Sequence, residues 1–220
     1  MALYTLGALF GALSCIFLGD KLGRKRTIQL GAAINCIGAL LESTSFELGQ
    51  LIVGRLVLGL GFGMVSATAP NWQSETSSAG HRGAAVLLES LFISLGLTLS
   101  AWTNLGMSFV ASSASWRFPL AMSGVFGLIV VSTIPALPES PRWLLLKGRT
   151  EEARKVLAAL EGTTEDDPVV ESSMVEISES IQVTGQGRFI DVFSNGELRL
   201  FNRACLACAG QLFQQVSYLR

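Results

Sequence analysis

Residues 48–70 have the sequence LGQLIVGRLVLGLGFGMVSATAP, an almost uninterrupted apolar run whose single charge is Arg55. A helix needs about 20 apolar residues to cross the hydrocarbon core of a bilayer, and this run is long enough. Inside it, Gly59 and Gly63 have the G-x-x-x-G spacing that lets two membrane helices approach closely. The stretch therefore predicts a membrane-spanning helix that packs tightly against a neighbour.

Similar apolar runs lie on both sides of this one. They cover residues 2–19, 27–43, 84–110 and 116–137, and a last run begins near Ala204 and continues to the final residue. Only 15% of the 220 residues are charged and mean hydropathy is +0.48, whereas soluble domains carry about 25% charged residues. The sequence predicts an all-α membrane protein, embedded in the lipid bilayer, with five transmembrane helices and the start of a sixth.

Basic residues gather on one side of this predicted membrane. Four follow the first run, one follows the third and eight lie between the fifth and the last, which makes thirteen of the 16 in the chain. The connections at 44–47 and 106–115 contain none. Because cytoplasmic loops are enriched in Lys and Arg, we predict that 20–26, 75–83 and 138–203 are cytoplasmic. This orientation places Met1 outside, so we expect a further helix upstream.

The stretch between residues 138 and 202 is charged and contains no spanning run. Thr150 and the Asp167-Pro168 pair each begin a short amphipathic helix, Gly162 ends the first, and a third is expected at 188–193. The chain therefore divides into three predicted parts. These are an N-terminal transmembrane bundle at 1–137, a cytoplasmic amphipathic helical domain at 138–202, and the truncated start of a further helix at 203–220.

Polar side chains inside the apolar runs are candidates for function. Arg55 costs about 2.5–3.5 kcal/mol at mid-membrane, so it needs a partner or water, unless it snorkels to the interface. Glu89 suits a structural ion pair, with a proton-coupling role as the alternative. The amides of Gln211, Gln214 and Gln215 can bond a hydroxyl-rich ligand or a neighbouring helix.

Other classes of function find little support. Cys205 and Cys208 form a C-x-x-C, but their flanks are apolar and no second ligand pair accompanies them, so helix packing is favoured over metal binding. His81 is the only histidine, and no nucleophile, base and orienting group occur together. We therefore expect no enzyme, no cofactor, no metal and no nucleic-acid partner.

Five motifs, in their order and spacing, resemble the sugar porter family of the major facilitator superfamily. They are Asp20-Lys21-Leu22-Gly23-Arg24-Lys25, Gly54-Arg55 with Gly59-Leu60-Gly61, Glu75 with Arg82-Gly83, Pro138-Glu139-Ser140-Pro141-Arg142-Trp143, and Gln214-Gln215. The Pro-Glu-Ser-Pro-Arg motif is specific in that position, and Trp116-Arg117-Phe118-Pro119 is similar to fungal members.

The resemblance implies that the chain covers helices two to seven of a twelve-helix transporter, which moves a sugar or related polyol by alternating access across the plasma membrane. Protons are the candidate coupling ion. The family pattern implies that Gln211, Gln214 and Gln215 line the sugar site. It also implies a cytoplasmic charge network made of Asp20, Arg24, Glu75, Arg82, Glu139 and Arg142. Proton-coupled members often carry an acid on helix one that faces the Arg55 position, and many carry a sugar-binding Gln where this chain has Ser90.

Two alternatives to a transporter remain open: a sugar sensor on the same fold, and a non-functional truncated product. Sugar uptake in cells that lack other transporters separates the first hypothesis from these two. In this fold the substrate binds between two halves that rock against each other. We therefore expect these 220 residues alone, reconstituted in liposomes, to show no saturable sugar uptake.

The charge asymmetry of the loops makes a topology prediction. A single cysteine introduced as Glu165→Cys in a cysteine-free background should resist a membrane-impermeant thiol reagent applied to intact cells, and should react once the cells are permeabilised. The physical reason is the retention of basic loops in the cytoplasm. Labelling of this cysteine from outside intact cells would reverse the predicted orientation.

Overall fold

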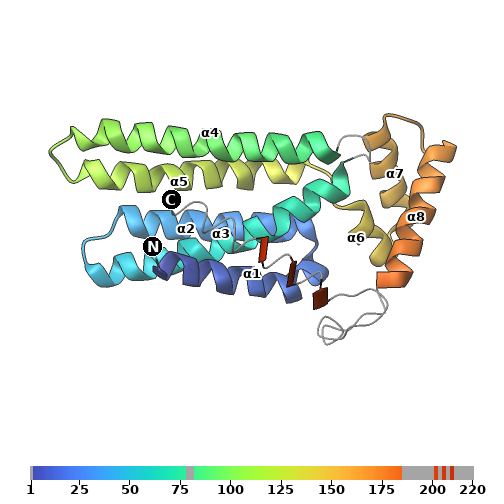
Figure 1. Ribbon diagram of the computed structural model, residues 1–220, viewed down its shortest axis with the longest axis horizontal. Coiled ribbons are helices and arrows are strands. Elements are labelled where there is room, and N and C mark those ends of the chain that lie inside the picture. Colours follow the sequence, from blue (N-terminus) through green and yellow to red (C-terminus); the bar gives the residue numbers. More distant parts are fainter. Residues whose placement is uncertain (1, 78–81, 185–200, 203–204, 207–208, 211–220) are drawn as a thin grey trace. The chain divides into compact units, whose positions relative to one another are not determined.

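The computed structural model describes residues 2–77, 82–184, 201–202, 205–206 and 209–210, and these residues contain helices and no strand. The chain forms two compact units, Met1–Met174 and Val175–Arg220, each described by itself. The long helices of the first unit (Figure 1) are α1 (Ala2–Leu22), α2 (Arg24–Ser43), α3 (Leu48–Thr76), α4 (Arg82–Ser108) and α5 (Ala114–Thr133). Shorter ones follow: η1 (Ile134–Ala136), α6 (Pro141–Leu146), α7 (Thr150–Glu161) and α8 (Pro168–Thr184).

The second unit contains the end of α8, and the described residues between 201 and 210 are helical as well. In the first unit, α4 and α5 form an antiparallel hairpin, and α1, α2 and α3 lie together as a second group (Figure 1). This arrangement of long antiparallel helices is what the apolar runs of the sequence predict.

Among the described residues, four helices are long and apolar enough to cross a membrane: α1, α3, Gly83–Ser108 of α4, and α5 with its extension to Ala136. The predicted span at 27–43 forms α2, but α2 is not sufficiently apolar to be counted with them. Its burial explains the difference, because α2 has eight buried residues and packs against both α3 and α5. Polar side chains on the face of a helix that packs against other helices avoid contact with lipid.

Glycines bring the backbones of α1, α2 and α3 into contact. A Cβ atom added at Gly63 would lie 2.8 Å from Cα of Ala8 in α1, and one added at Gly61 would lie 2.9 Å from Cα of Asn35 in α2. Gly59 likewise meets the backbone of Tyr4. Small residues at such crossings allow the close van der Waals packing that drives helix association in lipid. The G-x-x-x-G pair predicted from the sequence therefore lies in the α1–α3 contact.

The helix ends follow from local sequence. Gly23 has φ of 90°, a conformation that a side chain would strain, and it separates α1 from α2. Gly162, with φ of 68°, ends α7 as predicted. The predicted starts at Thr150 and Pro168 are confirmed as the first residues of α7 and α8. The span predicted to end at Pro70 continues as α3 to Thr76, with Pro70 inside the helix.

A small core joins α6 to α7. Trp143 and Leu144 of α6 and Ala153 of α7 are buried together, and Leu145 and Val156 pack against them. Ala153 and Val156 are apolar residues of α7, the helix predicted to be amphipathic, and both pack against α6. The helix expected at 188–193 lies outside the described residues, and the three-part division at 137 and 202 stays a prediction.

The glycine contacts predict a contrast between two alanine variants. Gly63→Ala should destabilise the protein, because overpacking costs about 1–3 kcal/mol while replacing a helical glycine gains only about 0.5–1 kcal/mol. Gly96→Ala in α4 is the matched control, since nothing lies within 4 Å of a Cβ at that site. Thermal unfolding in detergent should show a lower Tm for the first variant and an unchanged or higher Tm for the second. An equal response of both variants would contradict the assigned contact.

Candidate functional site

One charged cluster lies where α1, α2, α3 and the segment before α6 meet. The guanidinium of Arg24 donates to both carboxylate oxygens of Glu75, from Nε to Oε2 at 3.3 Å and from Nη2 to Oε1 at 3.4 Å. Its Nη1 also reaches Oδ1 of Asp20 at 3.5 Å and the carbonyl oxygen of Gly19 at 3.2 Å. The Arg24 and Glu75 side chains are only 18% and 16% exposed, so this paired interaction is largely shielded from water.

The carboxylate of Glu139 binds the beginning of α2. Its Oε1 accepts the backbone N–H of Arg24 at 3.1 Å and that of Lys25 at 3.0 Å. The first turn of a helix has N–H groups without intrahelical partners and a positive dipole end, and a carboxylate satisfies both. Gly23 is required here for a second reason, because a Cβ at that position would lie 2.7 Å from Oε2 of Glu139.

Ser140 connects Glu75 to α6. Its hydroxyl donates to Oε2 of Glu75 at 2.6 Å and accepts the backbone N–H of Trp143 at 3.2 Å, so it is also the N-cap of α6. Two indole N–H groups add to the attachment. Trp143 donates to the carbonyl oxygen of Asp20, and Trp72 donates to that of Pro138, each at 3.2 Å.

We call Asp20, Arg24, Glu75, Glu139 and Ser140 the inner cluster. The sequence predicted the first four as members of a charge network, and the structure brings them together. The side chain of Arg82 lies outside the described part of the chain. Arg142 is partly exposed and forms no ion pair with any described residue. Its membership of the network therefore stays a prediction.

A second charged site lies at the opposite end of α2 and α3. Nε of Arg55 is 3.3 Å from Oε1 of Glu42, and the two side chains are 32% and 2% exposed respectively. Neither of these two atoms has a hydrogen-bond partner among the described residues. Of the alternatives that the sequence left for Arg55, namely a partner, water or snorkelling, the structure provides a partner in Glu42.

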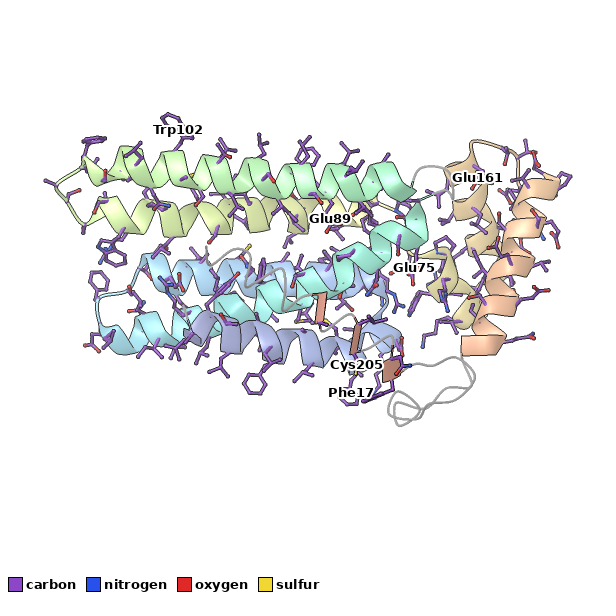
Figure 2. The ribbon with its side chains drawn as sticks, in the orientation of Figure 1. Phe17, Glu75, Glu89, Trp102, Glu161 and Cys205 are labelled. Carbon is purple, nitrogen blue, oxygen red and sulfur yellow. The ribbon has the colours of Figure 1, made fainter. Side chains whose placement is uncertain are left out.

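The other predicted site residues remain apart from these two clusters. Glu89 is partly exposed on α4 and has no ion pair within the described residues, while Glu75 lies near the end of α3 (Figure 2). Gln211, Gln214 and Gln215 lie outside the described residues, as do His81 and Cys208. Within the described ranges, no three His, Cys, Asp or Glu side chains come close enough to hold a metal ion.

Described residues line cavities between the helices at two places. One of about 480 Å³ lies between α4 and α5, and its lining is mainly apolar, with Phe92, Leu99 and Phe126 among its residues. The other, of about 360 Å³, lies between α1 and α3 and includes Asp20 and Arg24 of the inner cluster. The second cavity therefore opens beside groups that can exchange hydrogen bonds with water or a polar ligand.

Sequence reasoning missed Ser140 and Glu42 as functional positions. The signal for Ser140 was available, because a serine directly before a proline is a typical N-cap followed by the first helical residue. The signal for Glu42 was an acid near the outer end of one predicted span, opposite an arginine near the outer end of the next. The sequence does not say how α2 and α3 are aligned along their axes, so it could not establish that Glu42 contacts Arg55.

Comparison with known proteins gives a consistent family. The profile of the family described as "Sugar (and other) transporter" matches residues 1–219. The chain is 43% identical to the MFS-type transporter oryC of Aspergillus oryzae, over 97% of this chain and 40% of oryC. It is 38% identical to the sugar transporter STL1 of Saccharomyces cerevisiae, over 96% of this chain and 38% of STL1. The chain therefore spans about two fifths of the length of these curated relatives.

A solved structure with a similar fold is the proton:xylose symporter XylE from E. coli. The TM-score is 0.75 with 21% identity, over 91% of this chain and 45% of XylE. At this identity the likeness concerns the fold alone, and it agrees with the helical bundle predicted from the sequence.

The binding of Glu139 to the start of α2 predicts a local effect on hydrogen exchange. Glu139→Ala leaves the amides of Arg24 and Lys25 without their acceptor, at a cost of about 1–3 kcal/mol. Exchange of these two amides should accelerate on the order of tenfold to hundredfold. Glu152→Ala, which removes an exposed ion pair on α7, is the control and should leave them unchanged. Equal exchange in all three proteins would show that Glu139 does not hold this helix end.

Proposed function

This chain belongs to the sugar transporter family of the major facilitator superfamily, and from that membership we propose that it is part of a carrier that moves a sugar or related polyol by alternating access. The helices cross a membrane, and we propose the plasma membrane as its location. The relatives that match almost the whole chain include transporters and the high glucose sensor RGT2 of Saccharomyces cerevisiae, which agrees with the expectation that the protein is not an enzyme.

The observation that carries the mechanism is the inner cluster. It joins three separate parts of the chain through hydrogen bonds and ion pairs: the start of α2, the end of α3 and the segment leading into α6. Polar contacts of this kind have little net stability individually, so they can break and re-form between two conformations of similar free energy. We propose that the cluster is formed in one state of the carrier and released in the other.

The substrate side of the proposal rests on residues beyond the described part of the chain. Gln211, Gln214 and Gln215 are proposed to line the sugar site, because amides both donate to and accept from hydroxyl groups. We further propose protons as the coupling ion. The solved relative XylE is a proton:xylose symporter, which supports the idea at the level of the fold. A sugar sensor on the same fold is the alternative hypothesis.

The test is sugar uptake by the complete coding sequence that contains this chain, expressed in cells lacking their own sugar transporters. Wild type should take up a labelled sugar or polyol saturably. Glu75→Ala should reduce the rate severalfold or more, because Arg24 and Ser140 both lose a partner. Arg142 is a predicted member of the charge network that forms no ion pair with a described residue, and Arg142→Ala should also reduce the rate of uptake.

Glu152→Ala again serves as the control, and surface labelling should confirm equal amounts of each variant in the membrane. Normal uptake by both Glu75→Ala and Arg142→Ala would reject the proposed role of the inner cluster in transport. Sugar-dependent signalling without uptake by wild type would favour the sensor.

A further inference from the structure

The turn that connects α7 to α8 contains two threonines followed by three acids. Its residues 163–167 are Thr-Thr-Glu-Asp-Asp, between Gly162 at the end of α7 and Pro168 at the start of α8. The backbone N–H of Asp167 donates to the carbonyl oxygen of Thr164 at 3.2 Å, and this hydrogen bond closes the turn. Neither the inner cluster nor the proposed sugar site uses these residues.

The side chains of this turn differ in whether the fold already uses them. Oδ1 of Asp167 accepts the backbone N–H of Val169 at 2.9 Å, so this acid caps the start of α8. Thr164, Glu165 and Asp166 are exposed, and their side chains form no hydrogen bond or ion pair with any described residue. The hydroxyl and two carboxylates are therefore available to a partner in solution.

A cation lies beside the Thr164 position. Arg154 of α7 donates from Nη1 to the carbonyl oxygen of Glu165, the residue directly after Thr164, at 3.3 Å. It also donates from Nη2 to Oε2 of Glu171 in α8 at 2.8 Å. The Arg154 and Glu171 side chains are 29% and 60% exposed. An ion pair as exposed as this contributes little stability, so a more highly charged anion can take Arg154 from Glu171.

The charge pattern after Thr164 indicates what kind of protein recognises this turn. Glu165, Asp166 and Asp167 occupy the three positions that follow the hydroxyl, and a groove lined by Lys and Arg is the complement of such a segment. Acid-directed protein kinases use grooves of this kind to select a Ser or Thr that has acids on its C-terminal side. The predicted orientation places the turn in the cytoplasm, where protein kinases and ATP are present.

Other hydroxyl groups of the described residues match this pattern less well. The acids begin one residue further from Thr163, whose backbone N–H is bonded to the carbonyl oxygen of Ala158 at the end of α7. Thr150 and Ser173 are also followed by acids, but they lie within α7 and α8. The hydrogen-bonded backbone of a helix has to unfold before it can extend along a kinase groove. Thr164 is therefore the favoured acceptor.

We propose that Thr164 is a phosphorylation site for an acid-directed protein kinase, and that Arg154 binds the phosphate in place of Glu171. In the step, Oγ of Thr164 forms a bond to the γ-phosphorus of ATP. The bond from this phosphorus to the oxygen that bridges it to the β-phosphate breaks, ADP leaves, and the hydroxyl proton passes to the general base of the kinase. This inference does not depend on the proposed transport function.

The new group changes the charge of the connection between α7 and α8. A phosphothreonine carries a charge of about −1.5 to −2 at pH 7 and three strong acceptor oxygens. These oxygens can accept paired, charge-assisted hydrogen bonds from the Arg154 guanidinium. The phosphate also lies near the positive N-terminal end of α8, which favours a negative charge. Phosphorylation therefore exchanges an exposed carboxylate partner of Arg154 for a dianion.

The first measurement is phosphorylation of the complete, purified protein by casein kinase II and ATP, with the site mapped by mass spectrometry. Wild type should contain phosphate at Thr164. Thr164→Ser keeps the hydroxyl group and should be phosphorylated at the same position, whereas Thr164→Ala should not. Thr163→Ala should be phosphorylated at the wild-type rate, because Thr164 and the acids after it are unchanged.

Two acid variants test recognition by the kinase. Asp167→Asn removes the charge three residues after Thr164 but keeps an oxygen that can cap α8, so the turn should retain its conformation. Its rate of phosphorylation should fall about tenfold. Glu161→Gln is the matched control, because this exposed residue at the end of α7 (Figure 2) lies three residues before Thr164. Its rate should equal that of wild type.

Phosphorus NMR of the phosphorylated protein tests the role of Arg154. The second pKa of a phosphothreonine is about 6, and a neighbouring guanidinium lowers this pKa by favouring the dianion, whereas neighbouring carboxylates raise it. The phosphate pKa should therefore be higher in Arg154→Gln than in wild type. Lys155→Gln is the control, because it removes an exposed cation from the next residue of α7, and it should change the phosphate pKa less.

Three results would overturn the proposal or one of its parts. If Thr164 stays unphosphorylated while the same kinase phosphorylates an acidic peptide, the site is refuted. Equal rates for wild type and Asp167→Asn would refute recognition through the acids, and equal phosphate pKa values in wild type and Arg154→Gln would refute the role of Arg154. None of these assays requires sugar movement, so their outcome is independent of whether the protein transports sugar.

Discussion

The close contact of α3 with α1 and α2 determines the placement of the inner cluster and of the Glu42–Arg55 pair. Gly59 and Gly63 bring the backbone of α3 against α1, while Gly54 and Gly61 bring it against α2. Between helices in lipid there is little hydrophobic driving force, so packing at this range has to supply the association. Once α2 and α3 are fixed side by side in opposite directions, Glu42 meets Arg55 at one end and Arg24 meets Glu75 at the other.

These two ion pairs join α2 to α3 at two places along the helices. Arg55 and Glu75 are separated by about 30 Å along α3, close to the thickness of the hydrocarbon core. The pairs have opposite polarity, because α2 contributes the cation Arg24 to one pair and the anion Glu42 to the other.

The sequence predicted the helices better than their contacts. Apolar runs such as 48–70 predict spans because the bilayer fixes their length, and the loop charges suggest an orientation. The failure to anticipate Ser140 has a different cause, since its hydroxyl bonds Glu75, a residue 65 positions away. Arg142 also shows that contacts are harder to predict than helices. Its motif implies membership of the charge network, but the direction of its side chain depends on how α6 packs against the other helices. The predicted span at 27–43 forms α2, whose eight buried residues lie among the neighbouring helices, while Leu30, Ile37 and Leu40 are exposed.

The two contacts between α2 and α3 differ in how well their polar groups are satisfied. Near Arg24, each oxygen of Glu75 and the Oε1 atom of Glu139 accepts hydrogen bonds. Near Arg55, Oε1 of Glu42 accepts none from the described residues. Burying charges is repaid only when their remaining hydrogen-bonding capacity is satisfied. The glycine contacts that hold α2 against α3 therefore have to offset the cost of burying Glu42, whereas the cluster around Glu75 is stabilised by its own hydrogen bonds.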